Sequence, residues 1–174
     1  MLIAGNKIDV PGAETNYRKL KESYDIVPCS AESELALRKA EQKGIVQYIP
    51  GDSTFTIVHA EEKQRKALDF IKHLMEKFGS TGVQQVIDKA VFDLLDMIVV
   101  YPVENENKFS DKKGNVLPDA ILIKRSSTSH DLAYKIHEDI GKKFISAVDA
   151  RTKKTVAADY QLKNGDIISI KAGR

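Results

Sequence analysis

A short apolar run close to the first residue, Leu2-Ile3-Ala4, constrains the fold of this 174-residue chain more than any other feature. The run is followed by Gly5-Asn6-Lys7, so it has the length and the ending of a buried β-strand. Few residues precede it that could supply a neighbouring strand, and an intact domain rarely opens in this way. We therefore expect the chain to be a fragment of a longer protein.

The first 48 residues continue as helix, strand and helix. The pattern predicts a helix over Glu14–Glu22, a second short strand over Ile26–Cys29, and a helix over Glu32–Lys43 that ends at Gly44. Such alternation is typical of an α/β fold. Residues 1–48 are therefore interpreted as the closing part of an α/β domain.

Residues 49–97 predict a helical segment. Apolar side chains recur every three or four residues over Glu61–Phe78, with Gly79 as a C-terminal stop. The same spacing returns from Thr81, a candidate N-cap, to Ile98. Because the link between the two helices is short and both apolar faces are wide, we expect an antiparallel helical pair.

The hydrophobic period changes from helical to extended at Ile98. Residues 98–174 predict one helix over Asp131–Gly141, capped by Thr128 or Ser129, and the strands Ile98–Val103, Ala120–Lys124, Phe144–Val148, Thr155–Ala157 and Ile167–Lys171. A mixed sheet around a single helix is the pattern of a ubiquitin-like β-grasp domain, an α+β fold.

Composition excludes several classes of protein. The single cysteine, Cys29, rules out an internal disulfide, and a small buried side chain is its favoured interpretation. No apolar stretch reaches the roughly 18 residues of a membrane span, and the N-terminus does not resemble a signal peptide. The four histidines lack the cysteine or carboxylate partners of a zinc site. We expect a cytoplasmic protein without membrane contact or a metal site.

Asn6-Lys7-Ile8-Asp9 directly follows the first strand and matches the Asn-Lys-x-Asp pattern that reads guanine. The Asp9 carboxylate can accept hydrogen bonds from the ring N–H and the exocyclic amine of guanine together, a donor pair that adenine lacks. Asn6 can reach the purine N7 or tie neighbouring loops together. The aliphatic stem of Lys7 can cover the face of the ring.

A second loop of this kind follows the second strand. There the Ala31 N–H can donate to the guanine carbonyl oxygen, and Ser30 can support Asp9. Ligands bind at the carboxyl ends of strands in α/β sheets, so two loops after two strands predict one base-reading site. The alternative is a turn followed by a helix N-cap at Ser30.

With these two motifs the whole chain resembles the C-terminal part of an archaeal Obg-related, YchF-like GTPase. Residues 128–141 and 159–166 resemble a TGS domain, which is the most specific part of the likeness. The resemblance implies a remnant of a P-loop GTPase G domain, a helical segment and a β-grasp TGS domain. It also implies that the full-length parent uses GTP or GDP with Mg²⁺ and associates with the ribosome.

The phosphate-binding motif of a GTPase, Gly-x-x-x-x-Gly-Lys-Ser/Thr, does not occur in the 174 residues. We therefore expect no catalytic residue and no cofactor in this chain alone, and no GTP hydrolysis by it. We also expect its affinity for guanine nucleotides to be negligible although the base-reading motif is intact.

Residues 101–174 carry a net charge of +4 against −2 for residues 1–100. Candidate RNA-binding residues are Lys142, Lys143, Arg151, Lys153, Lys154 and Tyr160, with Lys171 and Arg174 as further basic side chains. If they gather at one end of the sheet, they can bind RNA phosphates while Tyr160 stacks on a base. A protein partner is the alternative. The exposed edges of a cut sheet make a homodimer a further hypothesis.

A free-standing RNA- or protein-binding TGS module without nucleotide chemistry is the second function that the sequence allows. The true start of the gene distinguishes the two: an upstream phosphate loop in frame supports the GTPase.

Overall fold

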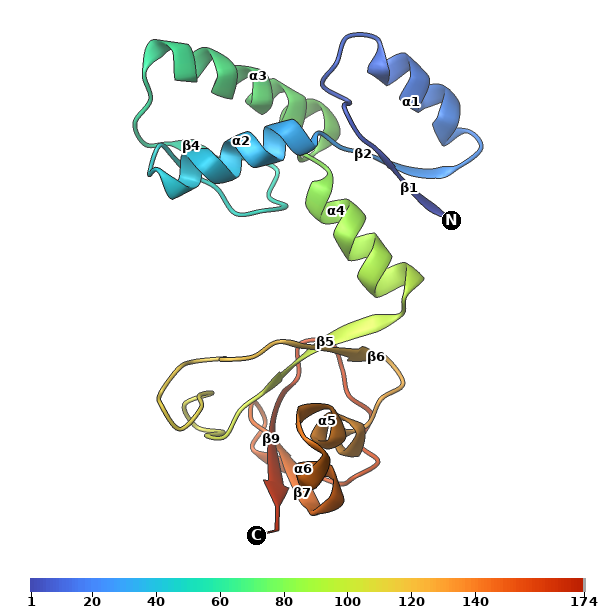
Figure 1. Ribbon diagram of the computed structural model, residues 1–174, viewed down its shortest axis with the longest axis vertical. Helices are drawn as coiled ribbons and strands as arrows, with labels where there is room; N and C mark the ends of the chain where they lie inside the picture. The colour runs from blue at the N-terminus through green and yellow to red at the C-terminus, as the bar shows by residue number, and fades with distance from the viewer. Residues whose placement is uncertain (174) are drawn as a thin grey trace. The chain divides into compact units, whose positions relative to one another are not determined.

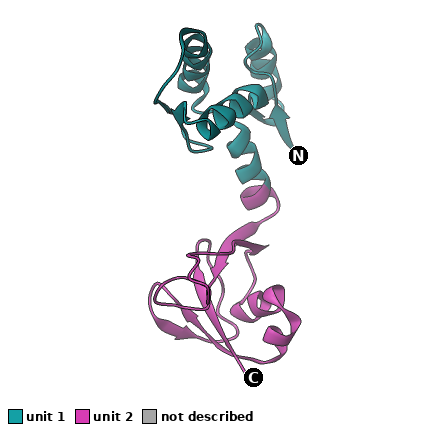
Figure 2. Ribbon diagram, turned by 60° about the vertical axis from the view of Figure 1, so that its left-hand side comes forward, with its two compact units in different colours: residues 1–90 teal, residues 91–174 magenta. Residues whose placement is uncertain are grey.

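The computed structural model describes residues 1–173 and divides the chain into two compact units, Met1–Ala90 and Val91–Arg174 (Figure 2). No helix in the described residues is long and apolar enough to cross a membrane. Each unit is described below by itself.

Unit 1 opens with a parallel pair of strands that connect to two helices. The elements are β1 (Leu2–Gly5), α1 (Ala13–Lys21), β2 (Asp25–Pro28) and α2 (Ala31–Gln42). The register pairs Leu2 with Asp25 and Gly5 with Pro28, so both strands end at the same edge of the sheet. All four predicted elements are confirmed, and no bound shifts by more than one residue. The first strand was expected to be buried, but β1 is half-buried with one exposed residue.

The remainder of unit 1 adds a small hairpin and a long helix to α2. Strands β3 (Val46–Gln47) and β4 (Thr56–Ile57) pair antiparallel, and α3 spans Glu62–Phe78. Side chains from α2, the hairpin and α3 share one apolar core: Leu37, Val46, Tyr48, Phe55, Leu68, Ile71 and Met75. The first half of the expected helical segment therefore packs into the same compact unit as residues 1–48.

The expected antiparallel pairing of the two long helices is wrong. Helix α4 (Val83–Asp88) continues as the π-helical segment η1 (Lys89–Leu94), and α4 contacts β1 instead of lying back along α3. Figure 1 shows α4 leading away from the end of α3. Neither α4 nor η1 buries a side chain, and Ile87 and Leu94 are exposed although their spacing predicts core positions. The spacing of the apolar residues after Thr81 predicted a helix correctly, but it did not predict that α4 contacts β1.

Unit 2 is a mixed five-stranded sheet in the order β6-β5-β9-β7-β8. Its elements are β5 (Met97–Pro102), β6 (Ile121–Lys124), α5 (Ser129–Ile136), α6 (Glu138–Lys142), β7 (Phe144–Asp149), β8 (Lys154–Val156) and β9 (Ile167–Ala172). β5 and β9 run parallel, and the other neighbouring pairs are antiparallel. Side chains of the sheet and of α5 form one core: Ile98, Val100, Ile123, Leu132, Ala147, Leu162 and Ile168.

The single helix predicted over Asp131–Gly141 is two short helices. Thr128 begins α5 with a reciprocal capping box, in which its hydroxyl accepts the Asp131 N–H and Asp131 accepts the Thr128 N–H. At His137 the backbone is extended, and the His137 Nδ1 accepts the Asp139 N–H to begin α6. Of the two predicted caps, Thr128 is correct, while Ser129 is buried and donates to the Ala157 carbonyl oxygen.

Candidate functional site: two loops at the end of the parallel strands

The two loops that the sequence predicts to read guanine lie side by side in unit 1. The Cys29 N–H donates to the Gly5 carbonyl oxygen at 3.0 Å, and the Ile8 N–H donates to the Cys29 carbonyl oxygen at 3.2 Å. These bonds extend the pairing of β1 and β2 beyond the last strand residues. Parallel register therefore places residues 6–9 next to residues 29–31, as the order strand, loop, helix predicts.

Asn6 joins the two loops. Its Oδ1 accepts the N–H of Lys7 at 2.8 Å and the N–H of Ala31 at 3.1 Å. The second bond links residues that are far apart in the sequence but adjacent at the ends of two strands. Of the two roles predicted for Asn6, the structure contains the loop-tying one. The Ala31 N–H was predicted to donate to the guanine base, and in the structure it donates to Asn6 Oδ1.

Lys7 adopts a left-handed backbone conformation, with φ at 64°. A residue with a Cβ rarely takes this conformation, and such strain is concentrated at functional sites. The turn leaves the Lys7 side chain exposed beside the loop. An exposed aliphatic stem is what the predicted contact with a ring requires.

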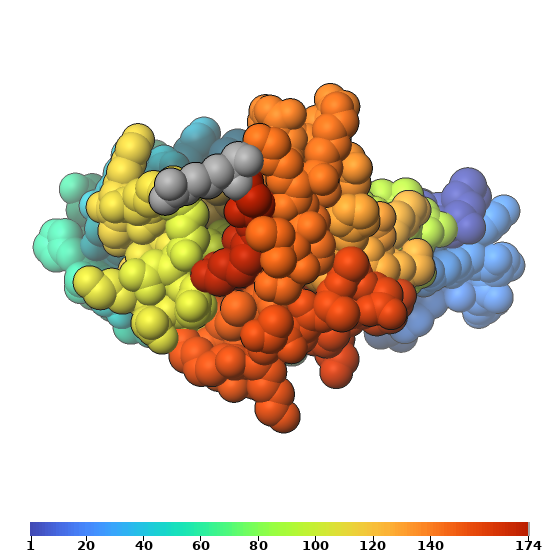
Figure 3. Space-filling model, turned by 90° about the horizontal axis from the view of Figure 1, so that it is seen from below, coloured from blue at the N-terminus to red at the C-terminus, as the bar shows by residue number. Residues whose placement is uncertain are grey.

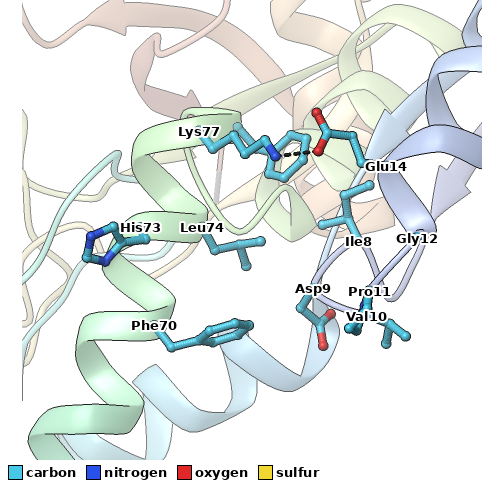
Figure 4. A pocket seen from close by; sticks show the side chains of 11 residues that line it. Ile8, Asp9, Val10, Pro11, Gly12, Glu14, Phe70, His73, Leu74 and Lys77 are labelled. Atoms are coloured by element: carbon cyan, nitrogen blue, oxygen red, sulfur yellow. Dashed lines mark hydrogen bonds and ion pairs between the residues drawn. The ribbon is translucent and has the colours of Figure 1, made fainter.

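Asp9 has a buried oxygen without a partner. Its Oδ1 is inaccessible to solvent and makes no hydrogen bond with any described residue. Asp9 lines a cavity of about 290 Å³, whose opposite wall includes Phe70 and Leu74 from α3 (Figure 4). Among the described residues that line this cavity, Asp9 is the only predicted site residue. An unpaired carboxylate oxygen is costly, so this position suits a group that brings hydrogen-bond donors.

Ser30 does not support Asp9 in the structure. Its hydroxyl donates to Ser33 Oγ at 2.9 Å and accepts the Ser33 N–H, which makes it the N-cap of α2. The alternative interpretation of this residue, a helix cap, is therefore present in the structure. Cys29, beside it, is buried as predicted, and burial raises the pKa of its thiol.

A buried polar cluster that the sequence interpretation missed fixes the second loop. Glu34 is 4% exposed, and its carboxylate accepts hydrogen bonds from Thr81 Oγ1 at 2.6 Å, Arg38 Nε at 2.7 Å and Tyr48 Oη at 2.8 Å. Burial raises the pKa of Glu34, but the bonds from Thr81, Arg38 and Tyr48 outweigh it and hold the pKa below its ordinary value. One signal was available: Glu34 precedes the inward-facing Leu37 by three residues, which places a charged residue on the buried face of a helix.

The segment Ser80–Gly82 packs directly against the second loop. The Ser30 N–H donates to the Thr81 carbonyl oxygen at 2.8 Å. A Cβ on Gly82 would overlap the Pro28 carbonyl oxygen, and Gly82 also has a positive φ of 80°. Ser30 is therefore fixed by its own helix on one side and by the start of α4 on the other.

The basic candidates of unit 2 lie in two groups, one at each end of β7, and not in a single cluster. Lys142 and Lys143 precede β7, whereas Arg151, Lys153 and Lys154 follow it. A strand of this length separates the two groups by roughly 20 Å. Arg174 lies outside the described residues.

Four of the candidate RNA-binding side chains have partners within unit 2. Lys142 forms an ion pair with Glu138 at 2.7 Å, and Arg151 Nη2 donates to the Gly165 carbonyl oxygen at 3.4 Å. Lys153 donates to the Glu106 carbonyl oxygen, and its ammonium lies 5.0 Å from the centre of the Phe109 ring. The Tyr160 hydroxyl donates to Asp166 Oδ2 at 3.2 Å, and its ring packs against the core. Burial and the Asp166 carboxylate raise the pKa of Tyr160. Its ring is therefore partly covered by the core of unit 2.

The described residues contain no group of three histidine, cysteine, aspartate or glutamate side chains placed to hold a metal ion.

Unit 1 has two loops at the carboxyl ends of parallel strands, and unit 2 is a separate mixed sheet. Models of known protein families match both parts of the chain. Residues 4–105 match the family model described as "Obg-like GTPase YGR210-like, G4 motif-containing domain", and residues 113–172 match the TGS domain. The chain belongs to the Obg-like GTPase family and carries a TGS domain.

Relatives agree with this assignment. The chain is 56% identical, over 98% of its length, to "Uncharacterized GTP-binding protein MJ1332" of Methanocaldococcus jannaschii, and it covers 44% of that protein. It is 31% identical, over 78% of its length, to "Uncharacterized GTP-binding protein C428.15" of Schizosaccharomyces pombe, covering 36% of it. The chain therefore spans less than half the length of the curated relatives that it matches.

A solved structure resembles the whole chain. The crystal structure of a GTP-binding protein from Pyrococcus horikoshii OT3 matches with a TM-score of 0.72 and 43% sequence identity, over 99% of this chain and 46% of that one.

Proposed function

We propose that unit 1 carries the guanine-reading end of a GTP-binding protein, with Asn6, Lys7, Asp9, Ser30 and Ala31 around the base. The observation that carries this proposal is the Asp9 carboxylate. It lies in the loop that follows β1, and one of its buried oxygens has no hydrogen-bond partner among the described residues. Guanine presents two adjacent donors that satisfy such a carboxylate, and adenine does not.

The other residues of the two loops define the position of the base. Asn6 holds the loops in contact through the Ala31 N–H, and Glu34 and Thr81 fix the second loop from behind. The Lys7 stem covers one face of the ring. The Ala31 N–H is shared between Asn6 Oδ1, which it contacts here, and the guanine carbonyl oxygen.

GTP hydrolysis, and the Mg²⁺ that accompanies it, belong in this proposal to the longer cytoplasmic protein. Its relatives are more than twice as long as the matched region, and the 174 residues contain no phosphate-binding motif. The chain alone is expected to bind GDP more weakly than about 1 mM, since the phosphates contribute most contacts in such sites. Micromolar binding of GDP to the 174-residue chain in calorimetry would contradict this.

The experiment on base reading uses the full-length gene product and fluorescent GDP, with unlabelled GDP, ADP and XDP as competitors. Asp9→Asn replaces an acceptor with an amide that can donate to the 2-carbonyl oxygen of xanthine. We expect the affinity for GDP to fall on the order of 100-fold, because two hydrogen bonds to a charged group are lost, while the affinity for XDP rises.

Asp52→Asn is the matched control, since Asp52 is an exposed aspartate in a turn of the same unit. It should leave all three affinities unchanged. The base-reading proposal fails if Asp9→Asn leaves the ratio of GDP to XDP binding as it was. Wild-type protein that binds no guanine nucleotide would instead favour the free-standing TGS module.

For unit 2 we propose a β-grasp fold that contacts RNA or the ribosome. The strand order β6-β5-β9-β7-β8, with the central pair parallel and α5 packed on the sheet, supports the fold. The turn after β7 supports the contact, since Arg151 and Lys154 are exposed and neither forms an ion pair with a described residue.

Filter binding to ribosomal RNA tests this contact. Arg151→Glu with Lys154→Glu should weaken binding about tenfold and reduce its salt dependence, because two phosphate contacts are lost. Lys142→Glu with Lys143→Glu, which makes the same charge change at the other end of β7, is the matched control and should have a smaller effect. Equal affinity of wild type and the first double variant would exclude the turn after β7 as the RNA site.

A further inference from the structure

Unit 2 contains a groove whose described lining residues do not include those of the turn after β7. The groove has a volume of about 420 Å³, within the range of roughly 300–1,000 Å³ that is typical of ligand pockets. One wall is formed by residues of the loop between β5 and β6, and the other by the α5–α6 segment and the end of β9. Figure 3 shows this loop (yellow) and the helical segment (orange) on either side of the C-terminal strand (red).

The floor of the groove is aliphatic. Val103, Ile136, Ile140 and Ile170 all line it. Ile136 and Ile170 also pack against the main core of unit 2, so the groove is a place where that core is left open to solvent. Apolar surface that remains accessible in a folded unit marks a binding site more often than isolated exposed residues do.

The rim of the groove is acidic. Three carboxylates, Glu104, Asp111 and Asp119, line it, and Lys112 is the only basic side chain among the described lining residues. The Lys112 ammonium lies 3.6 Å from Glu104 Oε1, so it offsets one of the three negative charges.

Asp111 is held in its charged form within this rim. The side-chain amide of Asn115 donates to Asp111 Oδ2 at 2.7 Å, and the Asn115 N–H donates to Oδ1 at 2.8 Å. A negative rim repels phosphate and attracts cationic groups, so the groove is unsuited to a nucleic-acid backbone.

We propose that this groove binds a protein segment in which aliphatic side chains are flanked by lysine or arginine. The aliphatic side chains occupy the floor formed by Ile140 and Ile170, and the flanking cations pair with Asp111 and Asp119. This partner differs from the one proposed for the turn after β7, so unit 2 has two surfaces of opposite chemistry. The inference does not depend on the guanine-reading proposal.

The test uses the isotope-labelled 174-residue chain and three probes. The first is the capped hexapeptide Lys-Leu-Ile-Arg-Leu-Lys, the second is its acidic counterpart Glu-Leu-Ile-Glu-Leu-Glu, and the third is a short single-stranded RNA. We expect the basic peptide to shift the backbone amides of Val103, Ile140 and Ile170, and the acidic peptide to bind at least about tenfold more weakly.

Two pairs of variants complete the test. Ile140→Gln should weaken binding of the basic peptide, whereas Ile145→Gln, at an isoleucine that is 69% exposed outside the groove, should not. Asp119→Lys should weaken it as well, and Asp159→Lys, at an exposed aspartate outside the groove, should not. The amide spectrum of each variant shows whether the unit is folded.

Three outcomes would overturn the proposal. They are the absence of groove shifts with the basic peptide up to about 5 mM, equal binding of the two peptides, or larger groove shifts with the RNA than with either peptide.

Discussion

The two-loop end of unit 1, for which we propose a base-reading role, and the sheet of unit 2 are held together in different ways. In unit 2, five strands and α5 enclose a core of aliphatic side chains, several of which are fully buried. At the two-loop end of unit 1 the sheet has two strands, and the loops are fixed by Asn6, by the Glu34 cluster and by the close approach of Gly82 to Pro28. Hydrogen bonds depend on geometry more strongly than apolar contacts do, which suits a site that must hold donors and acceptors in place.

Truncation of a buried apolar side chain in unit 2 should therefore have a larger effect than a change at the two loops of unit 1. Leu132→Ala removes a fully buried side chain from α5 and should lower the free energy of unfolding by about 3–4 kcal/mol. Leu122→Ala, at a leucine that is 43% exposed on β6, should cost less than about 1 kcal/mol. Urea unfolding measures both changes in the free energy of unfolding. Amide hydrogen exchange then shows which strands lose protection.

The comparison between the two regions predicts where the loss will appear. Leu132→Ala should speed exchange of the β5, β7 and β9 amides and leave the amides of β1 and β2 unchanged. A similar loss of protection throughout residues 1–90 would show that the two compact units do not unfold independently.

Gly82→Ala tests the backbone packing behind the second loop. The new Cβ would overlap the Pro28 carbonyl oxygen, so we expect a loss of about 3 kcal/mol from strain and displacement. Gly79→Ala is an instructive control, because Gly79 has a similar positive φ of 87° but no heavy atom near its Cβ position. It should cost only the conformational penalty of about 1–2 kcal/mol.

Hydrogen exchange at the Ser30 amide distinguishes the contact with Pro28 from the effect of the positive φ in the variants Gly82→Ala and Gly79→Ala. The Ser30 N–H donates to the Thr81 carbonyl oxygen, so its protection should fall in Gly82→Ala and persist in Gly79→Ala. Equal losses in both variants would mean that the positive φ alone, and not the contact with Pro28, requires glycine at residue 82.

Local sequence patterns were sufficient for most of the elements and for the position of the loops, because both depend on short-range spacing. They missed the β3–β4 hairpin and the break between α5 and α6. Asn6 and Ala31 come together because two short strands pair in parallel and each is followed at once by a loop. Thr128 was predictable as a cap because Asp131 completes the capping box three residues later.

Contacts between distant segments were not predictable in this way. The partners of Glu34 are Arg38, Tyr48 and Thr81, and nothing in the order of residues relates Thr81 to Glu34. The same holds for α4, whose apolar spacing predicts a helix but cannot say that it meets β1 and not α3. The separation of Lys142 from Arg151, in contrast, follows from the predicted strand Phe144–Val148, which the structure contains as β7.

Glu34 gives the smallest of the three effects and the one with a pH signature. Hydrogen bonds from Thr81, Arg38 and Tyr48 hold its pKa below the ordinary value of 4.5, against the opposing effect of burial. A carboxyl whose pKa is lowered on folding stabilises the folded state above its unfolded pKa, and this stabilisation is lost as the pH falls through the folded pKa. Glu34→Gln should therefore cost about 2 kcal/mol at pH 7, and the difference from wild type should shrink as the pH falls below 4.5.

The control is Glu32→Gln, at an exposed glutamate in the first turn of the same helix. It should change the free energy of unfolding by less than about 0.5 kcal/mol at any pH. Urea titrations of the three proteins at pH 7, 5 and about 3.5 give the comparison directly, since a stabilising carboxylate acts only while it is ionised. If the difference between wild type and Glu34→Gln is the same at all three pH values, the Glu34 cluster acts through its packing and not through its charge.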